Sequence, residues 1–104
     1  MSILSLTFHC TESHLEEWET YTKTELLLLV ENLMDVEKYI LSDVESEMLQ
    51  EGKNTNLLLI FDSNEIRQQF IETELVNISE RVESKFGENV ILFQTFLNPR
   101  KIKL

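Results

Sequence analysis

The sequence is poor in the residues that interrupt regular structure and in those that crosslink small folds. Its 104 residues include two glycines, one proline and one cysteine. The scarcity of glycine and proline argues against long irregular loops, and it nearly excludes a glycine-rich phosphate-binding loop. The single cysteine, Cys10, rules out a disulfide within the chain and is typical of a reducing compartment. We therefore expect regular secondary structure along most of the chain.

Long hydrophobic runs are also absent. Even the run Leu26–Val30, which no other run exceeds in length, is far shorter than the ~20 residues that cross a bilayer. The amino terminus lacks the charged segment, apolar stretch and cleavage site of a secretion signal. The sequence thus predicts a soluble cytoplasmic protein without a membrane partner.

Basic residues are few: 9 Lys and Arg stand against 19 Asp and Glu, for a net charge of −10. Three of the nine, Arg100, Lys101 and Lys103, lie in a basic C-terminal tail at residues 98–104. The rest of the chain is strongly acidic and would repel a phosphate backbone, so no nucleic-acid partner is predicted. Length and composition indicate a single globular domain over residues 1–104.

The first predicted element is a strand over residues 3–10, in which apolar and polar residues alternate. One face carries Leu4, Leu6, Phe8 and Cys10, and the other carries Ser5, Thr7 and His9. A period of two is typical of a strand with one buried face. Helical spacing then follows from Leu15 through Trp18 and Tyr21 and predicts a helix that ends near residue 34. Because the run Leu26–Val30 is apolar all round, we expect part of it to meet a second subunit or a terminal segment.

The second half repeats this pattern after a strand over residues 36–44. Residues 51–54 have turn chemistry, and the continuous apolar run 57–61 is typical of a strand buried on both faces. A helix is expected to begin after Asp62 or Ser63 and to close at Gly87, with an apolar stripe of Ile71, Leu75, Ile78 and Val82. A last strand spans residues 90–97, before Pro99.

The resulting order is βαββαβ, which predicts a ferredoxin-like α+β fold. Two interleaved right-handed βαβ crossovers give a four-stranded antiparallel sheet with both helices on one face. The helix-free face is expected to be apolar, because strands 57–61 and 90–97 carry apolar residues on both sides. A bare apolar sheet face implies a partner, and we predict a homodimer formed through the sheet.

The chain resembles a family of short bacterial proteins known only as a domain of unknown function, within the dimeric α+β barrel superfamily. The resemblance rests on Leu6-Thr7-Phe8-His9, on Trp18, and on the segment KFGENVILFQT at residues 85–95. It spans nearly the whole chain and implies the same ferredoxin-like fold and a dimer. Members of the superfamily include oxygenases, haem-degrading enzymes, small-ligand binders and proteins without known chemistry.

The chain departs from the family at positions that could carry an activity. The family usually has a histidine, a proline and a threonine-glycine pair late in the first helix and just beyond it, whereas residues 26–34 here contain none of them. An arginine commonly precedes the threonine of the last strand, where this chain has Gln94. If these residues carry an activity in relatives, the resemblance implies that this protein lacks it.

The candidate site is the polar side of the central strand, which could line a lumen between two subunits. The candidate lumen residues are Ser5, Thr7, His9, Tyr39 and Gln94. Gln94 and Thr95 point to opposite faces, and Gln94 is the one assigned to the lumen. A mixed polar and apolar cavity is typical of a small-molecule site. Alternatively, these groups hydrogen-bond to one another or to trapped water across the dimer interface.

Other clusters favour structural roles. His9, Cys10 and His14 are close in sequence, but adjacent strand residues point to opposite faces, so no metal site is predicted. Trp18 has core spacing, and Cys10 suits the core as a small residue. The helical carboxylates are expected to be solvated: Glu12, Glu16, Glu17, Glu19, Glu65, Glu72 and Glu74.

The function hypothesis is a non-enzymatic homodimer without a cofactor, acting as a small-ligand binder or an interaction module. No catalytic residue is assigned. The alternative is a cofactor-independent or haem-handling oxygenase-like enzyme with His9 in the lumen, because histidine titrates near neutral pH and is the sole candidate general base there. A third hypothesis is a protein-docking subunit that uses the Leu26–Val30 surface.

Overall fold

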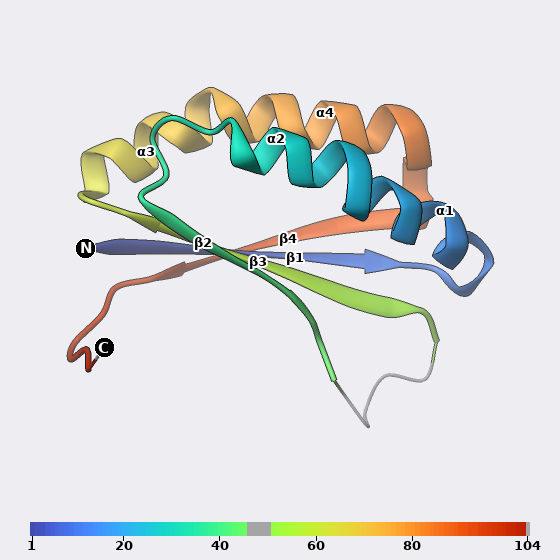
Figure 1. The fold of residues 1–104 in the computed structure, drawn as a ribbon, viewed down its shortest axis with the longest axis horizontal. Coiled ribbons are helices and arrows are strands. Elements are labelled where there is room, and N and C mark those ends of the chain that lie inside the picture. The colour runs from blue at the N-terminus through green and yellow to red at the C-terminus, as the bar shows by residue number, and fades with distance from the viewer. Residues whose placement is uncertain (46–50, 104) are drawn as a thin grey trace.

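The structure is a computed structural model that describes residues 1–45 and 51–103. It consists of one four-stranded antiparallel sheet with every described helix on the same side (Figure 1). Across the sheet the strand order is β2-β3-β1-β4. The predicted ferredoxin-like βαββαβ arrangement is confirmed. The strands and α-helices are β1 Ser2–Cys10, α1 Leu15–Tyr21, α2 Leu27–Glu31, β2 Lys38–Asp43, β3 Lys53–Phe61, α3 Asn64–Glu72, α4 Glu74–Phe86 and β4 Val90–Leu97.

Strand β1 is central and follows its sequence pattern closely. Buried and half-buried residues alternate along all of it. Leu4, Leu6, Phe8 and Cys10 are 0% exposed and lie beneath the helices. The prediction of a small core residue at Cys10 is confirmed. On its two sides β1 pairs antiparallel with β3 and β4, so strands from the second half of the chain fix its position.

Strand β3 corrects two predictions. It begins at Lys53, so the predicted 51–54 turn is shorter than expected, and residues 46–50 lie outside the described part. The prediction that residues 57–61 are buried on both faces is wrong for the single chain. Leu57, Leu59 and Phe61 are 0% exposed beneath the helices, whereas Leu58 and Ile60 on the other face are only half-buried. A continuous apolar run therefore marks one completed face and one uncovered face.

The first helical segment, α1 to α2, is continuous from Leu15 but changes its winding. A π-helical segment, Thr22–Leu26, joins α1 to α2, and the helix ends at Glu31 rather than near residue 34. Thr22 and Thr24 donate hydroxyl hydrogen bonds to Trp18 O (2.8 Å) and Thr20 O (2.7 Å), which offers the carbonyls a partner other than the usual backbone amide. Leu26 and Val30 are buried here, while Leu28 is 60% exposed.

The second helical segment, α3 and α4, begins and ends where its sequence predicts. The Ser63 hydroxyl accepts a hydrogen bond from the Ile66 amide (3.2 Å) and caps α3. A break at Thr73 separates α3 from α4. Of the predicted apolar stripe, Leu75, Ile78 and Val82 are buried, and Ile71 is half-buried against the core. Gly87 follows α4 with φ of +57°.

The core lies between the sheet and the helices, and an aromatic cluster fills one end of it. Trp18 is 1% exposed, and its ring packs 5.2 Å from that of Phe8, 5.7 Å from Tyr21 and 5.5 Å from Phe86, measured between centroids. The indole Nε1 donates to Thr55 Oγ1 (3.1 Å), so its polar atom is paired. This confirms Trp18 as a core residue. Within residues 1–45 and 51–103, the helices are all too short or too polar to cross a membrane.

Candidate functional site

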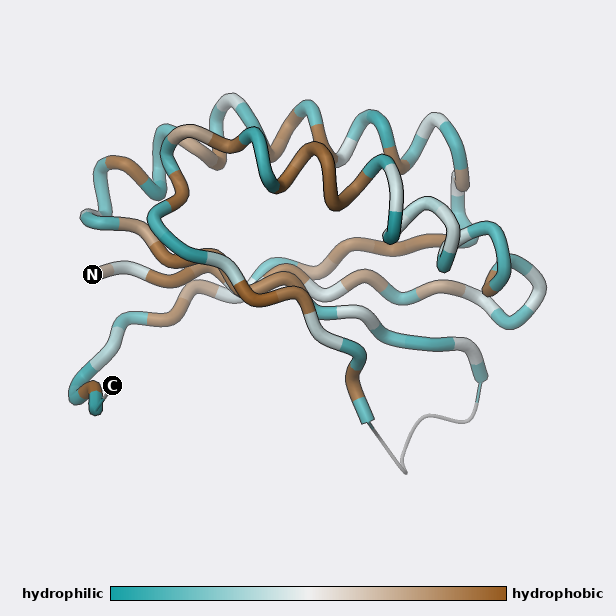
Figure 2. Tube along the Cα trace, in the orientation of Figure 1, coloured by the Kyte–Doolittle hydropathy of each residue, from teal (hydrophilic) through white to brown (hydrophobic). Residues whose placement is uncertain are grey.

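The face of the sheet that the helices leave uncovered is the candidate site, and we call it the open face. It is formed by alternate residues of all four strands, and Figure 2 shows that apolar residues occur on the strands as well as on the helices. Ladder pairing assigns these residues to the open face: Lys38, Ile40 and Ser42 from β2; Asn54, Asn56, Leu58 and Ile60 from β3; Ile3, Ser5, Thr7 and His9 from β1; and Ile91, Phe93, Thr95 and Leu97 from β4.

The middle of the open face is polar, and we call this part the polar island: Ser5, Thr7, His9, Asn54, Asn56 and Thr95. The Asn56 amide nitrogen donates to Ser5 Oγ (2.8 Å) and Thr7 Oγ1 (3.1 Å), with a longer contact to Leu6 O (3.3 Å). A backbone carbonyl can only accept, so the Leu6 contact fixes the nitrogen of Asn56 on this side. Part of the island is therefore held together by its own hydrogen bonds.

Apolar side chains lie as a frame around the polar island on both outer strands, although Ser42 of β2, opposite Asn56, is polar. Ile40 of β2 is 53% exposed, and on β4 Ile91 is 48%, Phe93 55% and Leu97 42% exposed. Leu58, Ile60 and Ile3 close one end of the frame on the central strands and are half-buried. Large apolar groups exposed side by side at this level are unusual for a surface that stays in water.

His9 lies at the edge of the island, beside the β2–β3 turn. Its Nδ1 is 2.7 Å from Asn54 Oδ1, and an amide oxygen only accepts, so a neutral His9 carries its hydrogen on Nδ1. Its Nε2 then carries no hydrogen and faces another acceptor, Glu51 Oε2, at 3.8 Å, so this contact is not a hydrogen bond in neutral His9. Gly52 has φ of +81°, and a Cβ there would clash with the backbone carbonyl oxygen of Cys10 and lie 3.0 Å from His9 Cε1. Glycine therefore lets residue 52 lie against the Cys10 carbonyl, beside His9.

Glu51 and Gly52 are also tied to Glu12, at the start of the first helical segment, by two reciprocal hydrogen bonds. The Glu12 amide donates to Glu51 Oε1 (2.6 Å), and the Gly52 amide donates to Glu12 Oε2 (3.0 Å). Both carboxylates thus accept a hydrogen bond from a backbone amide. This pairing positions Glu51 beside His9.

Two of the five predicted lumen residues lie elsewhere. Ser5, Thr7 and His9 share the open face as expected. Tyr39 pairs with Leu59 in the ladder and packs against the core, so its assignment to the lumen is wrong. Gln94 pairs with Leu6 and faces the helices, so the assignment of Gln94 to the lumen is wrong too. Thr95 pairs with Ser5 and occupies the position on the open face that was predicted for Gln94.

Charge distinguishes the open face from the helical layer. Lys38, at one corner, is its only ionisable residue besides His9. The helical layer instead exposes many carboxylates: Glu16, Glu17, Glu25, Glu31, Glu65, Glu72, Glu80 and Glu83. Of the carboxylates predicted to be solvated, Glu12, Glu16, Glu17, Glu65 and Glu72 are exposed, whereas Glu19 and Glu74 are half-buried. Lys23 lies 3.4 Å from Glu19, and Lys85 lies 3.9 Å from Glu25.

A metal centre needs several converging side-chain ligands. In residues 1–45 and 51–103, nowhere do three His, Cys, Asp or Glu side chains converge as metal ligands. Cys10 is buried beneath the helices while His9 faces the other way, and burial raises the pKa of the Cys10 thiol, with Glu51 and Glu17 adding to the rise. Within residues 1–45 and 51–103, the hydrogen bond of His9 is to the Asn54 amide rather than to a hydroxyl or thiol.

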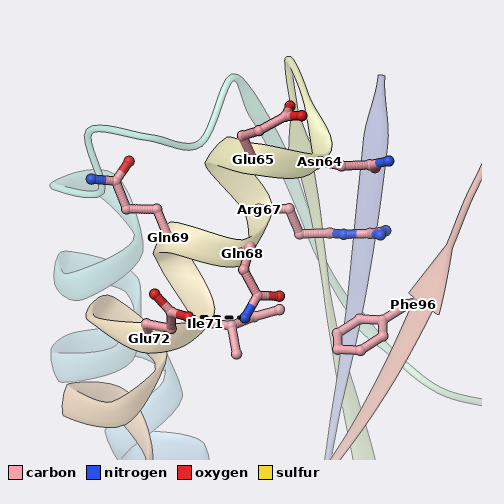
Figure 3. A pocket seen from close by; sticks show the side chains of 8 residues that line it. All are labelled: Asn64, Glu65, Arg67, Gln68, Gln69, Ile71, Glu72 and Phe96. Carbon is pink, nitrogen blue, oxygen red and sulfur yellow. Dashed lines mark hydrogen bonds between the residues drawn. The ribbon is translucent and has the colours of Figure 1, made fainter.

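A shallow hollow of about 620 Å³ runs along α3 and reaches Phe96 at the end of β4 (Figure 3). Arg67 dominates it, and the guanidinium lies 5.1 Å from the centre of the Phe96 ring. Arg67 Nη1 donates to Ile3 O (2.9 Å) and Leu97 O (3.2 Å). The arginine therefore ties the ends of β1 and β4 to α3, and we assign this hollow a structural role.

The fold and the open face together define a ferredoxin-like protein with one uncovered sheet face. Within that class the chain belongs to a family described as a domain of unknown function, DUF4286, whose sequence profile matches residues 1–99. The predicted family resemblance is confirmed. No curated protein matches the sequence.

Solved structures of similar fold have very different sequences. A protein assigned to the antibiotic biosynthesis monooxygenases of Deinococcus radiodurans matches with a TM-score of 0.70 and 12% identity, over 100% of this chain and 97% of that one. An ethyl tert-butyl ether degradation (EthD) family protein of Bacillus halodurans gives 0.68 and 14%, over 91% and 97%. A dimeric ferredoxin-like protein from an uncultured marine organism gives 0.63 and 17%, over 100% and 99%. At these identities the similarity establishes the fold alone.

Proposed function

We propose that the protein is a non-enzymatic homodimeric module whose two copies pack through their open faces. The observation that carries this proposal is the frame of exposed apolar side chains on the uncovered sheet, above all Ile40, Ile91, Phe93 and Leu97. Burying apolar area is favourable by roughly 25 cal/mol per Å². The frame therefore supplies a driving force for association that the single chain leaves unused.

The occupant we assign to the open face is a second copy of the chain. A net charge of −10 makes two copies repel through most of their surfaces, but the open face carries only Lys38 and His9 as ionisable groups. Four strands about 4.8 Å apart and about 25 Å long give a face of roughly 500 Å² in plan. A side-chain-covered surface is larger than its plan area, so this face is comparable to the roughly 800 Å² that each partner buries in a standard interface.

Three further observations support a structural rather than a catalytic assignment. Asn56 bonds to Ser5 and Thr7, and His9 bonds to Asn54, so several polar groups hold one another in place. Structural neighbours whose names call them dimeric ferredoxin-like proteins support the dimer. The chain also lacks the family's usual histidine in residues 26–34.

An oxygenase-like enzyme is the second candidate. Its support is the fold match to the Deinococcus protein together with the acceptor nitrogen that His9 turns toward the turn at Glu51. The His9→Ala variant separates the two candidates. An enzyme loses turnover with its dimer intact, whereas a structural His9 changes stability alone.

The dimer is tested by placing the same charge on opposite faces of β4. Phe93→Glu introduces a carboxylate on the open face, and Gln94→Glu introduces one on the next residue, which faces the helix side. Light scattering coupled to gel filtration should report a dimer for the wild type and for Gln94→Glu, and a monomer for Phe93→Glu. A monomeric wild type at micromolar concentration, or a dimeric Phe93→Glu, would refute the proposal.

A further inference from the structure

We propose that the polar island, enclosed between two copies, binds a small uncharged molecule with an apolar body and a hydrogen-bond-accepting oxygen such as a ketone. This inference rests on the proposed dimer and goes beyond it by naming the chemistry of a ligand. It is carried by the directions of the hydrogen bonds inside the island.

The island has donors to spare. Ser5 Oγ and Thr7 Oγ1 each accept a hydrogen bond from the Asn56 amide, so each keeps its own hydroxyl hydrogen for another acceptor. In the described part of the chain both hydroxyl oxygens accept from Asn56, and neither hydroxyl donates a hydrogen bond. Across the sheet, Ser5 lies in a row with Ile40, Leu58 and Thr95, and Thr7 lies in a row with Ser42, Asn56 and Phe93. Asn56 therefore holds both oxygens in position, and each hydroxyl hydrogen can turn toward an added acceptor.

The spacing of packed sheets leaves room for a ligand above these hydroxyls. Sheets that pack face to face lie about 10 Å apart, and a serine hydroxyl reaches only roughly 2.5 Å beyond its Cα. Two islands facing each other would hold their hydroxyl oxygens roughly 5 Å apart, too far for the ~2.8 Å of a direct hydrogen bond. Longer side chains such as Phe93 and Leu58 can fill the space around them. The enclosed donors then need a partner other than the opposite hydroxyl, and a gap of this size is bridged by a single acceptor atom, either the oxygen of a ligand or that of a trapped water.

The charges around the island select against an ionic ligand. The chain carries a net charge of −10, and Lys38, the only cation of the open face, lies beside Ile60 at the far end from His9. An anion would find no cation at the island and a repelling field outside it. A cation such as an ammonium group brings hydrogen-bond donors of its own, whereas the groups left over on Ser5 and Thr7 are donors that need an acceptor. The frame of Ile40, Leu58 and Phe93 suits an apolar body.

The test uses three probes that share a ring and differ in one group: acetophenone, ethylbenzene and benzoate. Binding to the full-length protein is followed by titration in ¹H–¹⁵N correlation NMR spectra, and light scattering on the same samples reports the oligomeric state. We expect acetophenone to bind at least tenfold more tightly than ethylbenzene, and benzoate to bind no better than ethylbenzene. The shifts should be centred on Ser5 and Thr7.

Variants assign the preference to the hydroxyls. Thr7→Val keeps the shape of the side chain and removes the donor, and Ser5→Ala is an independent second variant. Either should reduce the preference for acetophenone over ethylbenzene several-fold, and Thr7→Ser should retain it. Thr20→Val is the matched control, because the Thr20 hydroxyl donates to Glu16 O (3.2 Å) on the helical layer.

The outcomes distinguish this inference from the proposed function. A wild-type dimer that binds none of the probes, or binds ethylbenzene as tightly as acetophenone, overturns the ligand site and leaves the dimer standing. A preference that survives both Thr7→Val and Ser5→Ala also overturns it. A wild-type monomer overturns the proposed dimer, and the enclosed site with it.

Discussion

The same four strands present two faces whose side chains differ greatly in burial. On the side toward the helices, Leu6, Phe8, Leu57 and Leu59 are each 0% exposed. On the open face the large apolar groups of β2 and β4 stay near half exposed, as in Phe93 at 55%. Both faces obey the alternation of a strand, so alternation alone does not complete a core. The covered face is satisfied within one chain, and the open face requires material from outside it.

Polar groups differ between the two faces in the same way. Beneath the helices, Thr55 is 3% exposed and pairs with the indole of Trp18. One residue later Asn56 faces the other way, is half-buried, and bonds to two hydroxyls of the polar island. A buried group depends entirely on its partner, whereas water can replace the partners of a half-exposed one. The predictions below compare neighbouring residues on opposite faces.

The largest expected difference is between two phenylalanines on neighbouring strands of the sheet. Phe8→Ala removes a ring that is 0% exposed and should reduce the free energy of unfolding by about 3–5 kcal/mol. Phe93→Ala should change the free energy of unfolding of a single chain by roughly 0.5 kcal/mol, as for other surface substitutions, and should instead weaken the dimer. Urea titrations at two protein concentrations separate folding from association. Equal losses for the two variants in dilute monomer would contradict the comparison.

Hydrogen-bonding side chains should give a smaller difference of the same sign. Thr55→Val leaves the buried Nε1 of Trp18 without an acceptor and should cost about 1–3 kcal/mol. Asn56→Ala exposes Ser5 and Thr7 to water in the monomer and should cost no more than about 1 kcal/mol. Thermal unfolding at low protein concentration measures both. A larger loss for Asn56→Ala than for Thr55→Val would show that the open face is not solvated in the monomer.

The smallest effect concerns Tyr21 on the covered side. Its hydroxyl is buried and, within the described residues, has no hydrogen-bond partner. Because an unpaired buried hydroxyl is unfavourable, Tyr21→Phe should raise the free energy of unfolding at pH 7 by up to about 1 kcal/mol. Differential scanning calorimetry of the two proteins at this pH is the measurement. A clear loss of stability in the variant would indicate that the hydroxyl has a partner.

The advantage of Tyr21→Phe should grow in alkali. Burial raises the pKa of Tyr21 above its ordinary value of 10.0, Glu25 raises it further, and Arg81 lowers it in part. Above pH 10 the unfolded chain releases the phenolic proton while the folded chain retains it, so wild-type stability falls as the pH rises. The variant lacks this loss. A stability difference independent of pH between 8 and 10.5 would contradict the assignment.

Most of the fold could be predicted because its strands and helices carry clear periodicity. The alternation of Ile3–Cys10, the Ser63 cap and the limits of β4 all appear in the sequence and in the structure. The π-helical segment after Tyr21 could not be predicted, since its threonines are also compatible with an ordinary α-helix. The burial of Leu58 and Ile60 was overestimated because an apolar run does not reveal whether a second layer exists.

The site was harder to predict than the fold because it depends on which way each strand faces. In β4 both faces are largely apolar, so the sequence does not show whether Gln94 or Thr95 joins Ser5, and pairing opposite Leu6 decides it. Tyr39 lies in a strand interrupted by charges, and its pairing with Leu59 turns it toward the core. The bonds from Asn56 were missed because residues 5, 7 and 56 meet only once the ladder has formed.

The central position of β1 also has a consequence for synthesis on the ribosome. The first strand to be made pairs with residues 53–61 on one edge and with residues 90–97 on the other. Its two neighbours in the sheet are therefore translated later, and until then β1 has no strand to pair with on either edge. Contacts between segments so distant in sequence slow folding. A nascent chain that stops short of residue 90 would hold β1 with one edge unpaired, and an unpaired strand edge is prone to aggregation.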